Sequence, residues 1–114
     1  MNRDLVIDAL QELGSREAQE TLWLSDGSNG SLVSSFVEAI ERLCTDSGLA
    51  GDIESGAAGL DDRFVALYKR LKGVIRKIDY WNRDPRAVID DERMGDVRAI
   101  SRTMLDLILP DRDL

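Results

Sequence analysis

Histidine, the side chain that most often performs acid–base chemistry near neutral pH, is absent from this chain of 114 residues, and Cys44 is its single cysteine. Without histidine, neither a Ser-His-Asp triad nor an activated Cys-His pair can form. One cysteine without histidine also cannot make a structural zinc site. The remaining candidates are carboxylates, lysines and tyrosines, which every soluble protein carries. The sequence therefore predicts no catalytic residues, no enzyme activity and no cofactor.

Two acidic loops invite comparison with a calcium-binding loop. An EF-hand loop needs ligands at alternate positions, glycine at the sixth and a bidentate glutamate at the twelfth. Counting from Asp26 places Val37 at the twelfth position, and counting from Asp46 places Ala57 there. Because neither loop supplies the essential glutamate, both are interpreted as ordinary turns, and no metal site is predicted.

Asp90, Asp91, Glu92 and Asp96 form a third acidic group. A divalent cation could bind such a group. However, acids are also expected at a helix N-terminus, where the helix dipole favours negative charge. The structural interpretation is preferred.

Three aromatic residues are candidates for protein binding: Trp23, Tyr80 and Trp81. Tryptophan and tyrosine are enriched in binding hot spots, but they also pack at the ends of small helical bundles. Trp23 lies between two leucines, which favours a place in the core. Tyr80 and Trp81 lie at the end of the predicted basic helix, beside Arg83 and Arg86, and at least one of the two rings is expected at the surface.

Charge is distributed unevenly along the chain, whose formal net charge is −7. Residues 1–60 hold eleven acids and three bases (−8), residues 61–86 four acids and eight bases (+4), and residues 87–114 seven acids and four bases (−3). The overall acidity argues against nucleic acid as a partner, because phosphate binding needs a basic surface. For the basic segment, pairing with acidic neighbours inside the molecule is the preferred interpretation, and an interface is the alternative.

Apolar residues recur at helical spacing in several segments, and no alternation typical of a strand appears. The first predicted helix begins at Asn2 or Asp4 and is stopped by Gly14 in a left-handed conformation. A short helix follows from Ser15 to about Trp23. Further helices are expected after Ser31 or Ser34, after Asp61 or Asp62 and after Asp90 or Asp91, the last ended by Pro110. The segment 45–59 is predicted as a loop with one helical turn at 49–54, and Asp84-Pro85 as a break.

These elements predict an all-α fold: a single domain over residues 1–114, built as an antiparallel bundle of four main helices plus short helical segments. No signal peptide is expected at the N-terminus. Apolar runs such as Leu107-Ile108-Leu109 are far shorter than the ~20 residues of a membrane span. A cytoplasmic location without membrane association is therefore expected.

Three stretches carry a resemblance to a known class of protein: WLSDGSNGSLVSSFVEAIERLCTDSGL, DDRFVALYKRLKGVIRKID and VIDDERMGDVRAISRTMLDLI. They resemble small acidic helical proteins of bacteria that act as immunity proteins beside toxins. The likeness lies in chain length, charge and the general residue pattern of these stretches. It includes no diagnostic motif, so it implies no functional residue.

The leading hypothesis is a non-catalytic protein-binding domain of the immunity type, which neutralises a cognate toxin. An acidic inhibitor suits a basic toxin domain, because opposite charges speed association. Asp26, Asp46, Asp52 and Glu54 lie in or beside predicted loops and are the candidate binding acids, with Trp23 as an anchor. The alternative is a housekeeping helical interaction module, for which a homodimer through Tyr80 and Trp81 is one form.

Overall fold

The computed structural model describes residues 1–25, 34–56, 59–78, 80 and 84–109. These residues form helices and connections, with no strand among them. In chain order the elements are α1 (Arg3–Leu13), α2 (Arg16–Trp23), α3 (Phe36–Glu41), the π-helical segment η1 (Arg42–Asp46), α4 (Leu49–Ser55), α5 (Asp62–Ile75), α6 (Pro85–Asp90) and α7 (Arg93–Ile108). The predicted all-α class is confirmed for this part of the chain.

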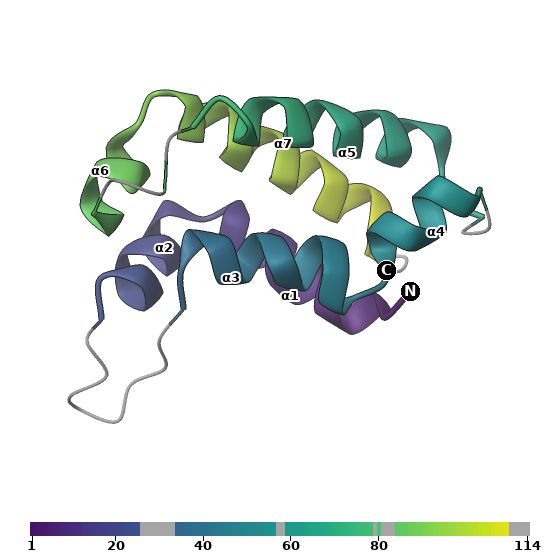
Figure 1. The fold of residues 1–114 in the computed structure, drawn as a ribbon, viewed down its shortest axis with the longest axis horizontal. Helices are drawn as coiled ribbons and strands as arrows, with labels where there is room; N and C mark the ends of the chain where they lie inside the picture. Colours follow the sequence, from purple (N-terminus) through teal and green to yellow (C-terminus); the bar gives the residue numbers. More distant parts are fainter. Residues whose placement is uncertain (26–33, 57–58, 79, 81–83, 110–114) are drawn as a thin grey trace, which may run out of the picture.

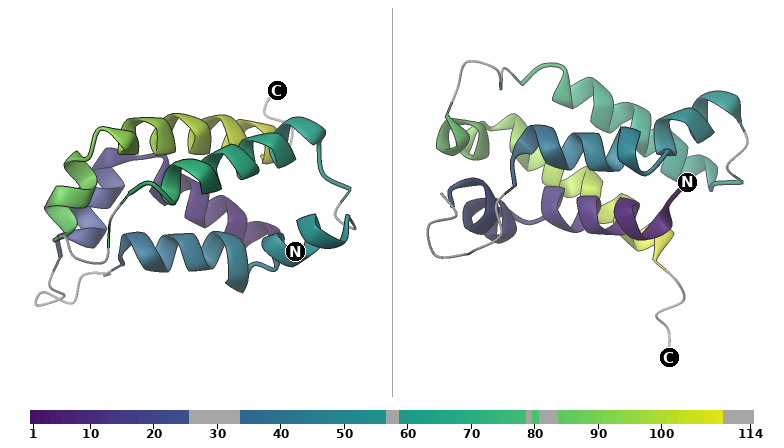
Figure 2. Two further views of the ribbon diagram at one scale, coloured as in Figure 1. Left: turned by 45° about the horizontal axis from the view of Figure 1, so that its top comes forward. Right: turned by 60° about the horizontal axis from the view of Figure 1, so that its bottom comes forward.

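The helices are arranged in two layers (Figures 1 and 2). One layer contains α5 and α7, which pack along each other, and the other contains α1 beside α3 and η1. Contacts between α1 and α7 join the layers. The guanidinium of Arg3, at the start of α1, donates to the carbonyl of Ile108, at the end of α7. The first and last helices of the molecule are thereby tied together.

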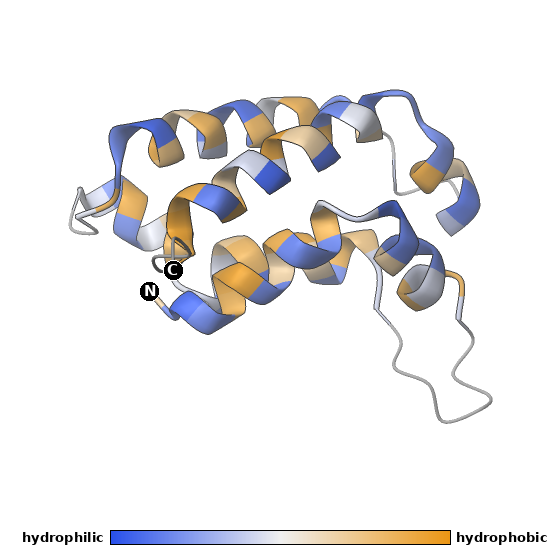
Figure 3. Ribbon diagram, turned by 180° about the vertical axis from the view of Figure 1, so that it is seen from behind, coloured by the Kyte–Doolittle hydropathy of each residue, from blue (hydrophilic) through white to orange (hydrophobic). Residues whose placement is uncertain are grey.

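A single cluster of buried apolar side chains fills the space between the layers. Polar and apolar residues alternate along the long helices, as expected for helices with one buried face (Figure 3). Leu71 of α5 and Met104 of α7 are completely buried. The largest fully buried apolar side chains are Phe64, Leu10, Leu13, Leu43, Leu49, Leu71, Ile89, Met94 and Met104.

Side-chain caps fix several helix starts, because a cap oxygen accepts a backbone N–H that has no partner inside the helix. Asn2, Ser15 and Asp61 cap α1, α2 and α5, as the sequence predicts. The predicted start of α3 at Ser31 or Ser34 is wrong. Ser35 is the cap, and its hydroxyl accepts from the backbone N–H of Glu38 at 3.1 Å.

The predicted start of α7 is also wrong by one or two residues, since the N-cap position is Glu92. The Asp91 carboxylate nevertheless accepts from the backbone N–H of Arg93 at 2.9 Å. The predicted stop at Pro110 falls outside the described residues.

Asp84-Pro85 does more than break the helical pattern. Asp84 caps α6, and Pro85 occupies its first turn, where a missing N–H costs nothing. The sequence pattern does not predict α6, because six residues are too few to show a helical period, although Val88 and Ile89 are buried.

Gly14 does not adopt the predicted left-handed conformation, since its φ is −87°. A Cβ at this position would lie 3.0 Å from Cγ of Arg102 and from the carbonyl oxygen of Leu10. The site therefore favours glycine because α7 passes close by. The left-handed end of a helix occurs instead at Gly56, which closes α4 with a φ of +70°.

The helical turn predicted at 49–54 is confirmed as α4, which ends one residue later at Ser55. The predicted start of the loop at residue 45 is wrong, because η1 extends to Asp46. α4 covers seven residues, and η1 continues α3 without a break. Ser47 joins the two: its buried hydroxyl donates to the carbonyl of Leu43 and accepts from the backbone N–H of Leu49.

No helix within the described residues combines the length and apolar character that crossing a membrane requires.

Candidate protein-binding surfaces

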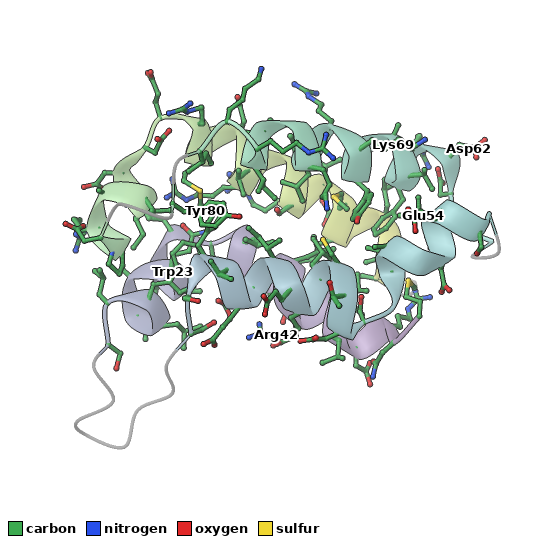
Figure 4. The ribbon with its side chains drawn as sticks, in the orientation of Figure 1. Trp23, Arg42, Glu54, Asp62, Lys69 and Tyr80 are labelled. Atoms are coloured by element: carbon green, nitrogen blue, oxygen red, sulfur yellow. The ribbon has the colours of Figure 1, made fainter. Side chains whose placement is uncertain are left out.

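Three aromatic rings meet at one end of the molecule. The Trp23 and Phe36 ring centroids lie 5.6 Å apart, and those of Phe36 and Tyr80 lie 5.2 Å apart, both edge to face. Around them is a mostly apolar hollow of about 170 Å³, also lined by Pro85 and Val88. Figure 4 shows Trp23 and Tyr80 close together at this end. The structure thus joins two residues that are 57 positions apart in the sequence.

Trp23 is only 4% exposed, so its place in the core is confirmed. Its indole N–H donates to Oε2 of Glu12 at 2.7 Å. Trp23 therefore forms the inner wall of the hollow. Tyr80 is partly exposed and forms the outer wall.

The Glu12 carboxylate belongs to a buried polar network that the sequence analysis missed. Glu12 is 6% exposed and accepts from Trp23, from the hydroxyl of Ser34 at 2.7 Å and from Nη1 of Arg42 at 3.0 Å. The same Arg42 nitrogen lies 3.1 Å from Asp8. This network connects α1, α2 and the start of α3–η1. The available signal was that Glu12 follows Ala9 by three residues, which places it beside the apolar face of the first helix.

The buried side-chain amide of Gln19 joins the two layers. Gln19 is fully buried, and its Nε2 donates to the carbonyls of Glu12 and Leu13. Its Oε1 accepts from Nε of Arg98 at 2.9 Å, while Nη2 of Arg98 donates to the carbonyl of Ile89. Burial lowers the pKa of Arg98 from its usual value.

The acids chosen from the sequence are not gathered with the aromatic residues. Glu54 lies on α4, at the far end of the molecule from Trp23 and Tyr80 (Figure 4). Asp52 pairs with the N-terminal ammonium of Met1 at 2.7 Å. Asp46 is exposed at the end of η1. Asp26 and Trp81, the other two candidates, lie outside the described residues.

An acidic face that was not predicted lies on α1 and α3–η1. Asp8 of α1 forms an ion pair with Arg42 of η1. Glu38 lies four residues before Arg42 in the sequence, and Asp46 lies four residues after it. Asp4 precedes Asp8 by one helical turn. The acidic face comprises Asp4, Asp8, Glu38, Glu41 and Asp46, all exposed. The spacing of Asp4 and Asp8 by four residues, and of Glu38 and Glu41 by three, within two predicted helices is the sequence signal for it.

The expectation that the basic segment 61–86 is paired internally holds only at its edges. Arg63 pairs with Asp61, and Arg86 with Glu20 at 2.9 Å. Within the part of the chain that the structure describes, no acid forms an ion pair with the cations on the body of α5 and its C-terminal turn, which are Lys69, Arg70, Lys72, Arg76 and Lys77. The expectation is wrong for these five cations.

The acids around the start of α7 have partners of their own. Asp90 pairs with Arg16, and Asp91 pairs with Arg93. Among the described residues, no group of three or more acids, cysteines or histidines is placed to hold a metal ion.

Comparisons of the chain with models of protein families, with curated proteins and with solved structures find no match.

Proposed function

We propose that this chain is a non-catalytic protein-binding domain of the immunity type, which neutralises a basic toxin in the cytoplasm. In this proposal the four longer helical elements (α1, α3–η1, α5 and α7) act as one antiparallel bundle that presents the acidic face to the partner. The observation that carries the proposal is the acidic face itself: five exposed carboxylates on two adjacent elements. The resemblance in size and charge to immunity proteins supports the same assignment.

Few bases of the same chain neutralise the negative charges of the acidic face. Arg42 is the one base that contacts it among the described residues; its side chain is 21% exposed, and it also pairs with the buried Glu12. Glu38, Glu41 and Asp46 have no ion pair with any described residue. A basic partner would therefore meet charges that are free to interact, which raises the association rate and selects against acidic partners.

The acids proposed from the sequence contribute unequally. Asp46 belongs to the acidic face and is retained as a binding residue. Asp52 is engaged with the N-terminus, and Glu54 lies beside the cations of α5. The proposed interface is therefore centred on α1 and α3–η1.

The test is co-expression with the product of the neighbouring gene, with growth as the measurement. The wild-type chain is expected to rescue growth from a toxic partner. The variant Glu38→Gln/Glu41→Gln/Asp46→Asn should lose rescue while remaining folded, because all three side chains are exposed.

The matched control is Glu17→Gln/Glu92→Gln/Asp96→Asn, which removes the same charge from exposed positions outside the acidic face. This control should rescue like the wild type. Equal loss in both variants would show that net charge, and not the acidic face, is responsible. A chain that binds neither neighbouring product would contradict the immunity function.

A second candidate is a helical interaction module that works through the aromatic hollow. The observation that favours it is the cluster of Trp23, Phe36 and Tyr80 beside a mostly apolar hollow of about 170 Å³. A homodimer through this end would be weakened by Tyr80→Ala, while the acidic-face variant would leave it unchanged. Sedimentation of the two variants at equal concentration separates the candidates.

A further inference from the structure

A second hollow, about 310 Å³ in volume, lies between α4 and α5. Three cations line it: Lys69 and Lys72 of α5, and Arg76, the residue that caps the C-terminus of α5. Glu54 of α4 stands with them, and Figure 4 shows Glu54 and Lys69 on these neighbouring helices. Ala50, Ile53 and Tyr68 supply the apolar part of the lining. Cations and an apolar wall therefore share one concave site.

The spacing of the three cations places them on the same side of α5. They follow one another at three and four residues, the spacing of neighbours on a helix surface. Nζ of Lys72 lies 5.9 Å from the centroid of the Tyr68 ring, within the range of a cation–π contact. Three positive charges and the Glu54 carboxylate leave the lining with a formal charge of +2.

We propose that this groove binds a phosphate monoester that carries a small apolar group. Near neutral pH most of such a ligand is a dianion, since its second pKa is about 6, so it matches the charge of the lining. Lysine and arginine are the usual phosphate-binding side chains. The volume is at the lower end of small-molecule sites, which span roughly 300–1,000 Å³.

The apolar group of the ligand would pack against Ala50, Ile53 and the Tyr68 ring. Burial raises the pKa of Tyr68, so its hydroxyl stays neutral and adds no negative charge that would oppose the ligand. The groove is formed by α4 and α5 and is separate from the acidic face on α1 and α3–η1. This inference therefore does not depend on the proposed function.

The experiment is a titration of the full chain with phenyl phosphate, followed by backbone amide NMR. Saturable chemical-shift changes are expected for residues around the α4–α5 groove. They should give a dissociation constant in the millimolar range or lower. Lys69→Gln/Lys72→Gln should weaken binding by roughly tenfold or more, because each removed charge lies close to a dianion. The matched control Arg70→Gln/Lys77→Gln removes the same charge from the same helical segment outside the groove lining, and should bind within about threefold of the wild type.

Glu54→Gln provides an independent test, because removing the single negative charge should tighten binding by about threefold. Phenyl sulfate has the same ring but one negative charge, and inorganic phosphate has the charge but no ring; both should bind more weakly than phenyl phosphate.

Absence of saturable shifts overturns the proposal. So does equal weakening in the groove and control variants, or binding of phenyl sulfate as tight as that of phenyl phosphate. Equal binding of inorganic phosphate would contradict the apolar part of the site.

Discussion

Replacing Glu12 by leucine tests the buried network that holds α1, α2 and α3–η1 together. Leucine is close to glutamate in size, so the substitution leaves only a small cavity. Its main effect is to remove the acceptor of the Trp23 indole N–H and of the Ser34 hydroxyl, both of which are buried. A buried donor left without an acceptor costs about 1–3 kcal/mol.

Arg42 limits the loss. When one partner of a buried ion pair is removed, the cost is about 3–5 kcal/mol if the other charge is left uncompensated. In Glu12→Leu, Arg42 retains its ion pair with Asp8, in which Nη1 and Oδ2 lie 3.1 Å apart, and its side chain is partly exposed. The charge of Arg42 therefore remains compensated. The two neutral donors left without an acceptor account for most of the cost, and we predict that Glu12→Leu lowers the free energy of unfolding by about 2–6 kcal/mol.

The assay is urea unfolding followed by far-ultraviolet circular dichroism, with Gln11→Leu as the control. Gln11 is the exposed neighbour on α1, and its substitution should change stability by less than about 0.5 kcal/mol. A double-mutant cycle with Trp23→Phe, which deletes the indole N–H, should show coupling of about 0.5–3 kcal/mol. If Glu12→Leu is as stable as Gln11→Leu, or if the cycle shows no coupling, the network does not stabilise the fold.

Three further outcomes are expected, each measured by the same unfolding assay. Leu71→Ala should cost about 2–5 kcal/mol, because Leu71 is completely buried on α5; a cost under about 0.5 kcal/mol would place it at the surface. Ser101→Ala should raise stability by about 0.5–2 kcal/mol, because the Ser101 hydroxyl is buried without a hydrogen-bond partner among the described residues; a loss of stability would reveal a partner. Burial raises the pKa of Tyr68 in the folded state, so the unfolded chain ionises first above pH ~10 and stability should fall there. Relative to the variant Tyr68→Phe, the free energy of unfolding of the wild type should fall by about 1.4 kcal/mol per pH unit in that range. Parallel pH profiles for the two proteins would show that Tyr68 ionisation does not affect stability.

The fold could be predicted from the sequence where apolar residues repeat over several turns. The apolar residues at helical spacing in α5, such as Phe64, Leu71 and Ile75, and the caps at Asn2, Ser15 and Asp61 are local patterns, and the structure confirms them. Short elements were harder, because α6 has too few residues for a period to appear. Gly14 shows a different limit: the residue type indicated an unusual site, but the reason, the nearby Arg102, is a contact between helices 88 residues apart.

The candidate surfaces could be predicted only in part, because they depend on how the layers are assembled. Trp23 could be placed in the core from its leucine neighbours. Its contact with Phe36, and that of Phe36 with Tyr80, required the fold. The sequence favours acids in loops as binding residues, because loops often contact partners, whereas the acidic face lies on helix surfaces. The groove between α4 and α5 could not be foreseen, since Glu54 and the α5 cations meet only through tertiary structure.

The most direct test of the proposed function is the association rate with the toxic partner as salt concentration is varied. Exposed charges act over about 8 Å at physiological ionic strength and farther at low salt. Glu38→Gln/Glu41→Gln/Asp46→Asn should therefore slow association at low salt by roughly threefold or more and flatten its salt dependence. The control Glu17→Gln/Glu92→Gln/Asp96→Asn should associate much as the wild type does. Identical rates and salt slopes for the two variants would contradict a partner-binding role for the acidic face.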